Sequence, residues 1–204
     1  MTKDGLTVLN QKILLDAGFL SVSRTEFTYR TPGGGENSQV RLVVHQASSV
    51  AAIVHNPDEN CLYFVKQFRY PAYRPGSPAL ADNGWLTELV AGRTGLNETT
   101  REAMVREVEE ETGLKVIEID AVGTFFLSPG ASNEQLSLFY TRVEGAPPVR
   151  DHLGVGDEWI ESVRLTPEAF LAKVEAMTLN DAKTIVAAEY IRRRPDLFKL
   201  GGAA

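Results

Sequence analysis

An acidic segment between two glycines constrains this chain more than any other feature. The segment runs from Gly92 to Leu114 and reads GRTGLNETTREAMVREVEEETGL, with six glutamates between positions 98 and 111. On a helix, at about 100° per residue, Glu107, Glu110 and Glu111 share one arc, and Val108 and Thr112 lie on the opposite side, where a core can cover them. Clustered carboxylates repel one another unless a cation lies among them, and hard oxygen ligands suit Mg²⁺ or Mn²⁺. The segment therefore predicts a helix that holds a divalent cation.

The order of the residues separates this segment from an ordinary acidic helix. A glutamate-rich helix with interleaved arginines is usually a solvated surface with ion pairs one turn apart. Here Gly92, Glu98, Arg106 and residues 107–114 match every fixed position of the pattern G-x5-E-x7-R-E-U-x-E-E-x-G-U, where U is aliphatic. That pattern is the Nudix box, and the chain resembles the Nudix hydrolases. The resemblance implies an α+β fold, an α/β/α sandwich with a mixed β-sheet between helices, and hydrolysis of a nucleoside diphosphate linked to another group.

The resemblance also implies a role for each position of the box. The expected ligands of Mg²⁺, for which Mn²⁺ is a possible substitute, are the Ala91 carbonyl and the carboxylates of Glu107, Glu110 and Glu111. Glu110 binds directly or through water, and it counts among the catalytic candidates as well. Arg106 is expected to orient the glutamates by ion pairing, and Glu98 to tie the loop to the helix.

A second motif narrows the resemblance to one subfamily. Residues 128–134 read SPGASNE and follow the box by about one strand. In that position they resemble the S-P-G-x-x-x-E element of ADP-ribose and nucleoside-diphosphate-sugar pyrophosphatases. The upstream runs VKQFR (residues 65–69) and ELVAG (residues 88–92) also resemble this subfamily. ADP-ribose, cleaved to AMP and ribose 5-phosphate, is therefore the expected substrate. GDP-mannose or another nucleotide sugar is the alternative, because the metal site contacts only the diphosphate. A non-catalytic nucleotide-sugar sensor is less favoured, since it has no need of all three glutamates.

The catalytic base and the substrate contacts rest on fewer residues. Glu158 matches an acidic position that the subfamily often uses as base or additional metal ligand, and Glu134 is the second candidate. Gly156 stands where some ADP-ribose enzymes have another glutamate, which weakens the ADP-ribose assignment. Arg69 is a candidate phosphate contact because a guanidinium can bind phosphate oxygens in bidentate fashion. Arg41 is a weaker candidate.

The periodicity of the chain divides it into two parts. In residues 1–45 the segments 19–29 and 39–45 read as a β-hairpin across a glycine-rich turn, which is marginal alone. The resemblance implies that this region forms a homodimer. Residues 46–204 form the expected Nudix hydrolase domain. Its expected strands are 49–55, 62–68, 85–91, 116–126, 135–143 and 157–165, and its expected helices are 99–112, 166–176 and 181–194.

Composition excludes several other classes. The net charge of −6 argues against binding of nucleic acid or an anionic membrane. Cys61 is the single cysteine, so no intrachain disulfide forms. No apolar stretch is long enough to span a bilayer, and the first residues lack the apolar region of a signal peptide. A cytoplasmic enzyme with a small-molecule partner is expected.

Overall fold

The computed structural model describes residues 5–76, 82–147 and 159–200. The chain forms two compact units. One unit comprises residues 1–48 together with 125–136, and the other comprises residues 49–124 together with 137–204. The acidic segment of residues 92–114 lies in the second unit. The division predicted at residue 45 stays a prediction, and the segment after residue 124 joins the N-terminal strands.

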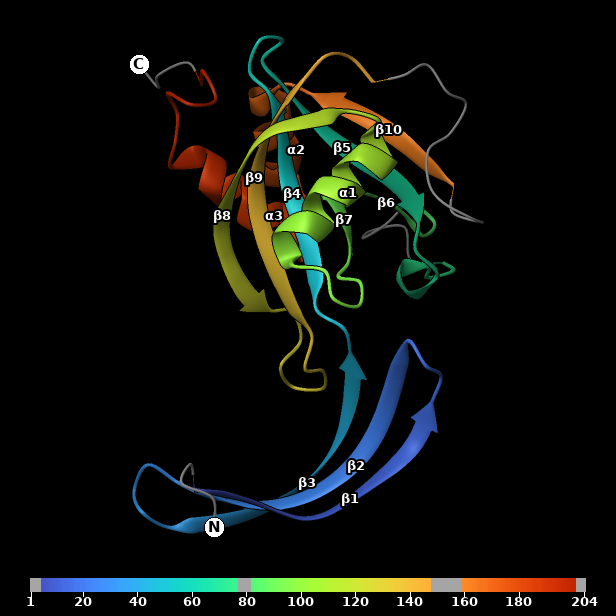
Figure 1. Ribbon diagram of the computed structural model, residues 1–204, viewed down its shortest axis with the longest axis vertical. Helices are drawn as coiled ribbons and strands as arrows, with labels where there is room; N and C mark the ends of the chain where they lie inside the picture. Colours follow the sequence, from blue (N-terminus) through green and yellow to red (C-terminus); the bar gives the residue numbers. More distant parts are fainter. Residues whose placement is uncertain (1–4, 77–81, 148–158, 201–204) are drawn as a thin grey trace. The chain divides into compact units, whose positions relative to one another are not determined.

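The first unit is built on a three-stranded antiparallel sheet in the order β1-β2-β3 (Figure 1). The strands are β1 (Leu6–Asp16), β2 (Leu20–Arg30) and β3 (Glu36–Gln46). The expected two-stranded hairpin is therefore incomplete, because β1 adds a third strand. Its sequence, LTVLNQKILLD, does not alternate regularly, and its pairing with β2 is interrupted by two register shifts. Such irregularities hide a strand from a search for period-two alternation.

The second unit contains a seven-stranded sheet with the path β10-β5-β4-β9-β8. Two short strands lie off this path, where β6 pairs with β5 and β7 pairs with β4. The bounds are β4 (Ser49–Asn56), β5 (Cys61–Phe68), β6 (Trp85–Glu88), β7 (Val90–Arg93), β8 (Lys115–Phe126), β9 (Gln135–Glu144) and β10 (Ile160–Leu165). The single strand expected over 85–91 is thus two strands that change partner at Leu89. A short 3-10 helix, η1 (Tyr70–Ala72), follows β5.

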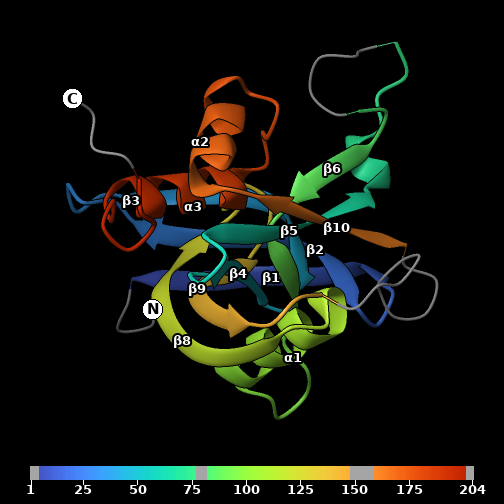
Figure 2. The same cartoon turned by 90° about the horizontal axis from the view of Figure 1, so that it is seen from above.

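Helices cover both faces of this sheet. Figure 2 shows α1 (Thr100–Thr112) on one side, and α2 (Pro167–Glu175) and α3 (Ala182–Arg192) on the other. Successive side chains of β5 point to opposite faces of the sheet, so this strand contributes to the hydrophobic packing on both faces. Tyr63 and Val65 pack in one buried cluster with Met104 of α1. Phe64 points to the opposite face, where its ring centroid lies 4.9 Å from that of Phe170 in α2. The α+β class with a sheet between helices is confirmed.

The bounds of α1 follow from its capping residues. Thr99 and Glu102 form a reciprocal capping box, in which the Glu102 amide donates to Thr99 Oγ1 at 3.2 Å and the Thr99 amide donates to Glu102 Oε2 at 2.9 Å. The helix ends at Gly113, whose φ of 69° is the left-handed conformation that favours glycine. The observed helix therefore agrees with the expected range 99–112.

A buried histidine gives the second unit an acid-sensitive core. The His55 ring is fully buried, with Nδ1 3.0 Å from the Tyr140 hydroxyl and its centroid 4.8 Å from that of Phe198. Burial, and then the positive charges of Lys199 and Arg142, lower the pKa of His55 from 6.5 to about 4. Protonation of the folded protein is therefore unfavourable at this position.

We expect His55 to contribute stability above pH 6.5 that is lost as the pH falls from 6.5 towards about 4. In that range the unfolded chain binds a proton at His55 and the folded chain does not. Urea unfolding of the wild type and of His55→Gln, measured across the range, checks this. The free energy of unfolding of the wild type should fall relative to that of the variant on acidification, and parallel curves would contradict the assignment.

In the part of the chain that the structure describes, no helix is both long and apolar enough to cross a membrane.

Candidate active site

Helix α1 places two of its glutamates against strand β7. Glu111 is only 6% exposed, and its Oε2 accepts a hydrogen bond of 3.3 Å from the Ala91 amide. The carboxyl group of Glu107 lies directly against Gly92, where a Cβ atom would come within 1.9 Å of Glu107 Cδ. Any larger residue at position 92 would displace this carboxylate. The fold therefore gathers Glu107, Glu111 and Ala91, three of the expected metal ligands, which are separated by up to 20 positions in the chain.

Glu98, Glu107 and Glu110 form an acidic cluster with the cation Arg106 at its centre. Its Nε donates to Glu98 Oε1 at 2.9 Å, and its Nη1 donates to Glu107 Oε1 at 2.8 Å and to Glu110 Oε2 at 2.9 Å. Its Nη2 also donates to the Arg93 carbonyl at 3.1 Å. The hydrogen bond to Glu98 is the largest of the causes that raise the pKa of Arg106, and the same bond lowers the pKa of Glu98. Arg106 thus links the loop, β7 and two glutamates.

The chemistry of the donor set fits a hard divalent cation. Glu107 and Glu111 supply carboxylate oxygens, and the backbone of Ala91 lies beside them. Among residues 5–76, 82–147 and 159–200, however, no three side chains of His, Cys, Asp or Glu already converge as a metal site. Glu107 and Glu110 each turn an oxygen towards Arg106. A bound cation would compete with this guanidinium for the same oxygens, so the ligand assignment stays a prediction.

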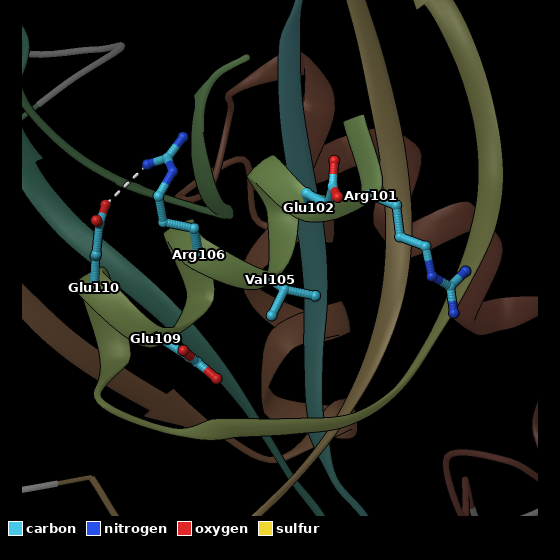
Figure 3. Close-up of a pocket in the computed structure, with 6 residues that line it drawn as sticks. All are labelled: Arg101, Glu102, Val105, Arg106, Glu109 and Glu110. Carbon is cyan, nitrogen blue, oxygen red and sulfur yellow. Dashed lines mark hydrogen bonds and ion pairs between the residues drawn. The ribbon is translucent and has the colours of Figure 1, made fainter. Parts of the chain in front are cut away.

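A cavity of about 560 Å³ runs along the outer face of α1. Its lining residues are Arg101, Glu102, Val105, Arg106, Glu109 and Glu110. Figure 3 shows Arg106 and Glu110 turned towards each other, with Arg101 pointing away from them. The cavity therefore shares two charged residues with the acidic cluster, and Glu110, whose side chain is 39% exposed, lies at the boundary between them.

The sequence search missed a buried ion cluster beside this site. Arg69 Nε donates to Glu88 Oε1 at 2.7 Å, and Lys183 of α3 contacts the other oxygen of the same carboxylate. Glu88 is only 2% exposed. The available signal was the acidic residue that ends the strand WLTE just before the apolar run LVA, because a buried carboxylate needs a partner. Nothing in the sequence identified Lys183 as that partner.

The remaining predicted residues lie elsewhere in the chain. Arg41 of β3 is in the first unit, where its Nη1 donates to the Val40 carbonyl at 2.9 Å. Glu134 also belongs to that unit, and its Oε2 accepts a hydrogen bond of 2.5 Å from Gln46 Nε2. Glu158 falls outside the described residues. The roles of all three residues stay predictions.

Comparison with known proteins adds independent findings. Residues 45–188 match the family model of the NUDIX domain. The chain is 28% identical over 177 residues to a GDP-mannose pyrophosphatase of Yersinia enterocolitica, and the aligned residues cover 87% of this chain and 90% of the relative. A GDP-mannose pyrophosphatase of Cronobacter sakazakii is 29% identical over 155 residues, 76% of this chain and 78% of the relative. The fold is similar to a crystal structure of an ADP compounds hydrolase, with a TM-score of 0.69, 14% identity and 94% of each chain covered.

Proposed function

The chain belongs to the NUDIX domain family, and from this membership we propose that it hydrolyses the pyrophosphate bond of a nucleoside diphosphate sugar with the help of Mg²⁺. The observation that carries the proposal is the placement of Glu107 and Glu111 against Ala91 and Gly92. Nudix pyrophosphatases need such a carboxylate set, and a protein that only bound a nucleotide sugar would not need it. Mn²⁺ is the expected substitute for Mg²⁺.

Two substrates are supported by different observations. The motif SPGASNE and the runs around it favour ADP-ribose, which would give AMP and ribose 5-phosphate. The names of the relatives from Yersinia and Cronobacter favour GDP-mannose. Both molecules present the same diphosphate to α1 and β7, so the acidic cluster does not discriminate between them.

In the proposed reaction the residues of α1 and β7 hold the diphosphate for attack by water. Glu107, Glu111, Glu110 and the Ala91 carbonyl would hold the cation, which neutralises phosphate charge and lowers the pKa of bound water. Arg106 would fix the orientation of the carboxylates, since it bonds to both Glu107 and Glu110. Glu158, or else Glu134, would accept the proton of the attacking water. Arg69 would bind a phosphate oxygen of the substrate.

A panel of nucleotide sugars incubated with Mg²⁺ tests the proposal. ADP-ribose and GDP-mannose should yield a nucleoside monophosphate and a sugar phosphate, identified by chromatography and mass spectrometry. Selective turnover of one of them settles the substrate. If no member of the panel is cleaved with Mg²⁺ or Mn²⁺ by a folded protein, the proposed function is rejected.

We further propose that the protein is a homodimer formed through the sheet β1-β2-β3. Large apolar side chains, each at least 42% exposed, are concentrated on this sheet, and they are Leu6, Val8, Leu9, Ile13, Leu14, Leu15, Val40 and Leu42. Soluble monomers rarely expose so many large apolar side chains on one small sheet, and exposed apolar surface of this extent marks an interaction site. A three-stranded sheet with so much exposed apolar surface is also poorly stabilised unless something covers it. A second copy of the chain is the occupant that the subfamily resemblance favours.

Light scattering after size exclusion is expected to show about twice the chain mass of 22.4 kDa. Leu14→Lys should shift the protein towards the monomer, because it places a charge in the proposed interface. Leu96→Lys is the matched control, since Leu96 is 98% exposed and lies in the second unit. An active wild-type monomer at every concentration would contradict the proposal.

A further inference from the structure

The carboxylate of Glu88 is shared between two cations. Glu88 ends β6, and its side chain is only 3% exposed. Its Oε1 accepts the hydrogen bond from Arg69 Nε at 2.7 Å, while its Oε2 is the atom that Lys183 Nζ contacts. A buried carboxylate remains ionised at low cost only when it is paired in this way. Each of its oxygens therefore has one cationic partner.

Lys183 is held in place by the first turn of α3. Its side chain is 11% exposed, and its Nζ lies 3.1 Å from Asp181 Oδ1. Asp181 also caps the helix, since its Oδ2 accepts hydrogen bonds from the Thr184 amide at 3.1 Å and from Thr184 Oγ1 at 2.7 Å. Thr184 Oγ1 in turn accepts a hydrogen bond of 3.3 Å from the Leu89 amide. The start of α3 is thus bound to the two residues, Glu88 and Leu89, that precede β7.

This arrangement restricts how Arg69 bonds to Glu88. Arginine and a free carboxylate usually form a bidentate pair with two parallel hydrogen bonds. Here Lys183 occupies Oε2, and Arg69 bonds to Glu88 through Nε alone. The Arg69 side chain is 40% exposed, and within the described residues its only hydrogen bond is the one from Nε, so Nη1 and Nη2 donate none. Two adjacent NH₂ groups on a fixed guanidinium are the geometry that binds two oxygens of a phosphate.

We propose that Lys183 is a positioning residue for the diphosphate of the substrate. By occupying Oε2 of Glu88, it limits Arg69 to one bond and leaves both terminal NH₂ groups of Arg69 to bind phosphate oxygens. Lys183 itself does not touch the substrate. The inference rests on the proposed function, in which a nucleoside diphosphate is the ligand.

The test is a double-mutant cycle read by binding rather than by turnover. Calorimetry measures the Kd of inorganic pyrophosphate, with Mg²⁺ present, for the wild type, Lys183→Met, Arg69→Met and the double variant. Lys183→Met should weaken binding about tenfold, the effect of losing one charge-assisted hydrogen bond, and Arg69→Met should weaken it further, because it removes both NH₂ groups. The double variant should bind within about twofold of Arg69→Met, because Lys183 acts only through Arg69. Lys173→Met, a change at an exposed lysine of α2, is the control and should bind as the wild type does.

Two results would overturn the proposal. Losses that multiply in the double variant would mean that Lys183 contacts the phosphate directly. Wild-type affinity in Lys183→Met would mean that the lysine only supports the fold. If Lys183→Met does not fold, Lys183→Leu, which also removes the ammonium group from Oε2 of Glu88, replaces it in the cycle with the same expectations. Failure of the wild type to cleave any nucleotide sugar would reject the proposed function instead, because pyrophosphate binding is measured without hydrolysis.

Discussion

Glu107→Gln and Glu111→Gln are each expected to lower kcat at least about a hundredfold, since a catalytic cation contributes several kcal/mol to stabilisation of the transition state. An amide replaces the charged oxygen that would bind the cation, while the size of the side chain is unchanged. Steady-state assays with saturating Mg²⁺ measure the loss. Circular dichroism and thermal unfolding should show an intact fold, because each change also relieves repulsion among neighbouring carboxylates.

Glu109→Gln is the matched control for these two variants. Glu109 lies on the same helix, between the expected ligands, but it is exposed and occupies the unconstrained position of the box. It should keep wild-type kcat. Wild-type turnover by Glu107→Gln or Glu111→Gln at saturating Mg²⁺ would show that the assignment of the metal site to α1 is wrong.

Glu158→Gln is expected to lower kcat by about 10²- to 10⁴-fold with little change in KM, the usual contribution of general-base catalysis. The amide cannot accept the proton of the attacking water. If Glu158 is mainly a metal ligand, added Mg²⁺ should restore part of the rate. A series of rates against Mg²⁺ concentration separates the two roles.

Glu134→Gln is the companion variant for Glu158→Gln. Glu134 is the other candidate base, and in the first unit its carboxylate bonds to Gln46. Wild-type kcat in Glu158→Gln, together with a large loss of kcat in Glu134→Gln, would identify Glu134, in the loop of residues 127–134, as the general base. A loss below about twofold in both variants would leave neither residue as the base.

Local signals predicted the bounds of α1 well. The capping box at Thr99 and the left-handed Gly113 are set by neighbouring residues, so the bounds of α1 could be read from the chain. The pattern of the box also predicted which side of the helix carries the glutamates. It did not predict that Glu107 would rest against Gly92, because that contact depends on how α1 packs on β7.

Long-range contacts and irregular strands were beyond sequence reasoning. Lys183 and Glu88 are 95 positions apart, and no periodicity links α3 to β6. Strand β1 lacks regular alternation, and the break between β6 and β7 at Leu89 follows from a change of pairing partner from β5 to β4. Pairing of this kind is decided by tertiary structure, and intrinsic preference carries little information about it.

Hydrolysis of ADP-ribose and GDP-mannose in water labelled with oxygen-18, followed by phosphorus NMR, tests the central claim most directly. We expect the diphosphate signals of at least one of them to be replaced by those of two phosphate monoesters, one of which carries the label, and we expect chelation of the cation to stop the reaction. Turnover that continues at an undiminished rate in excess chelator, or a folded protein that leaves both diphosphates intact with Mg²⁺ and with Mn²⁺, would contradict the account.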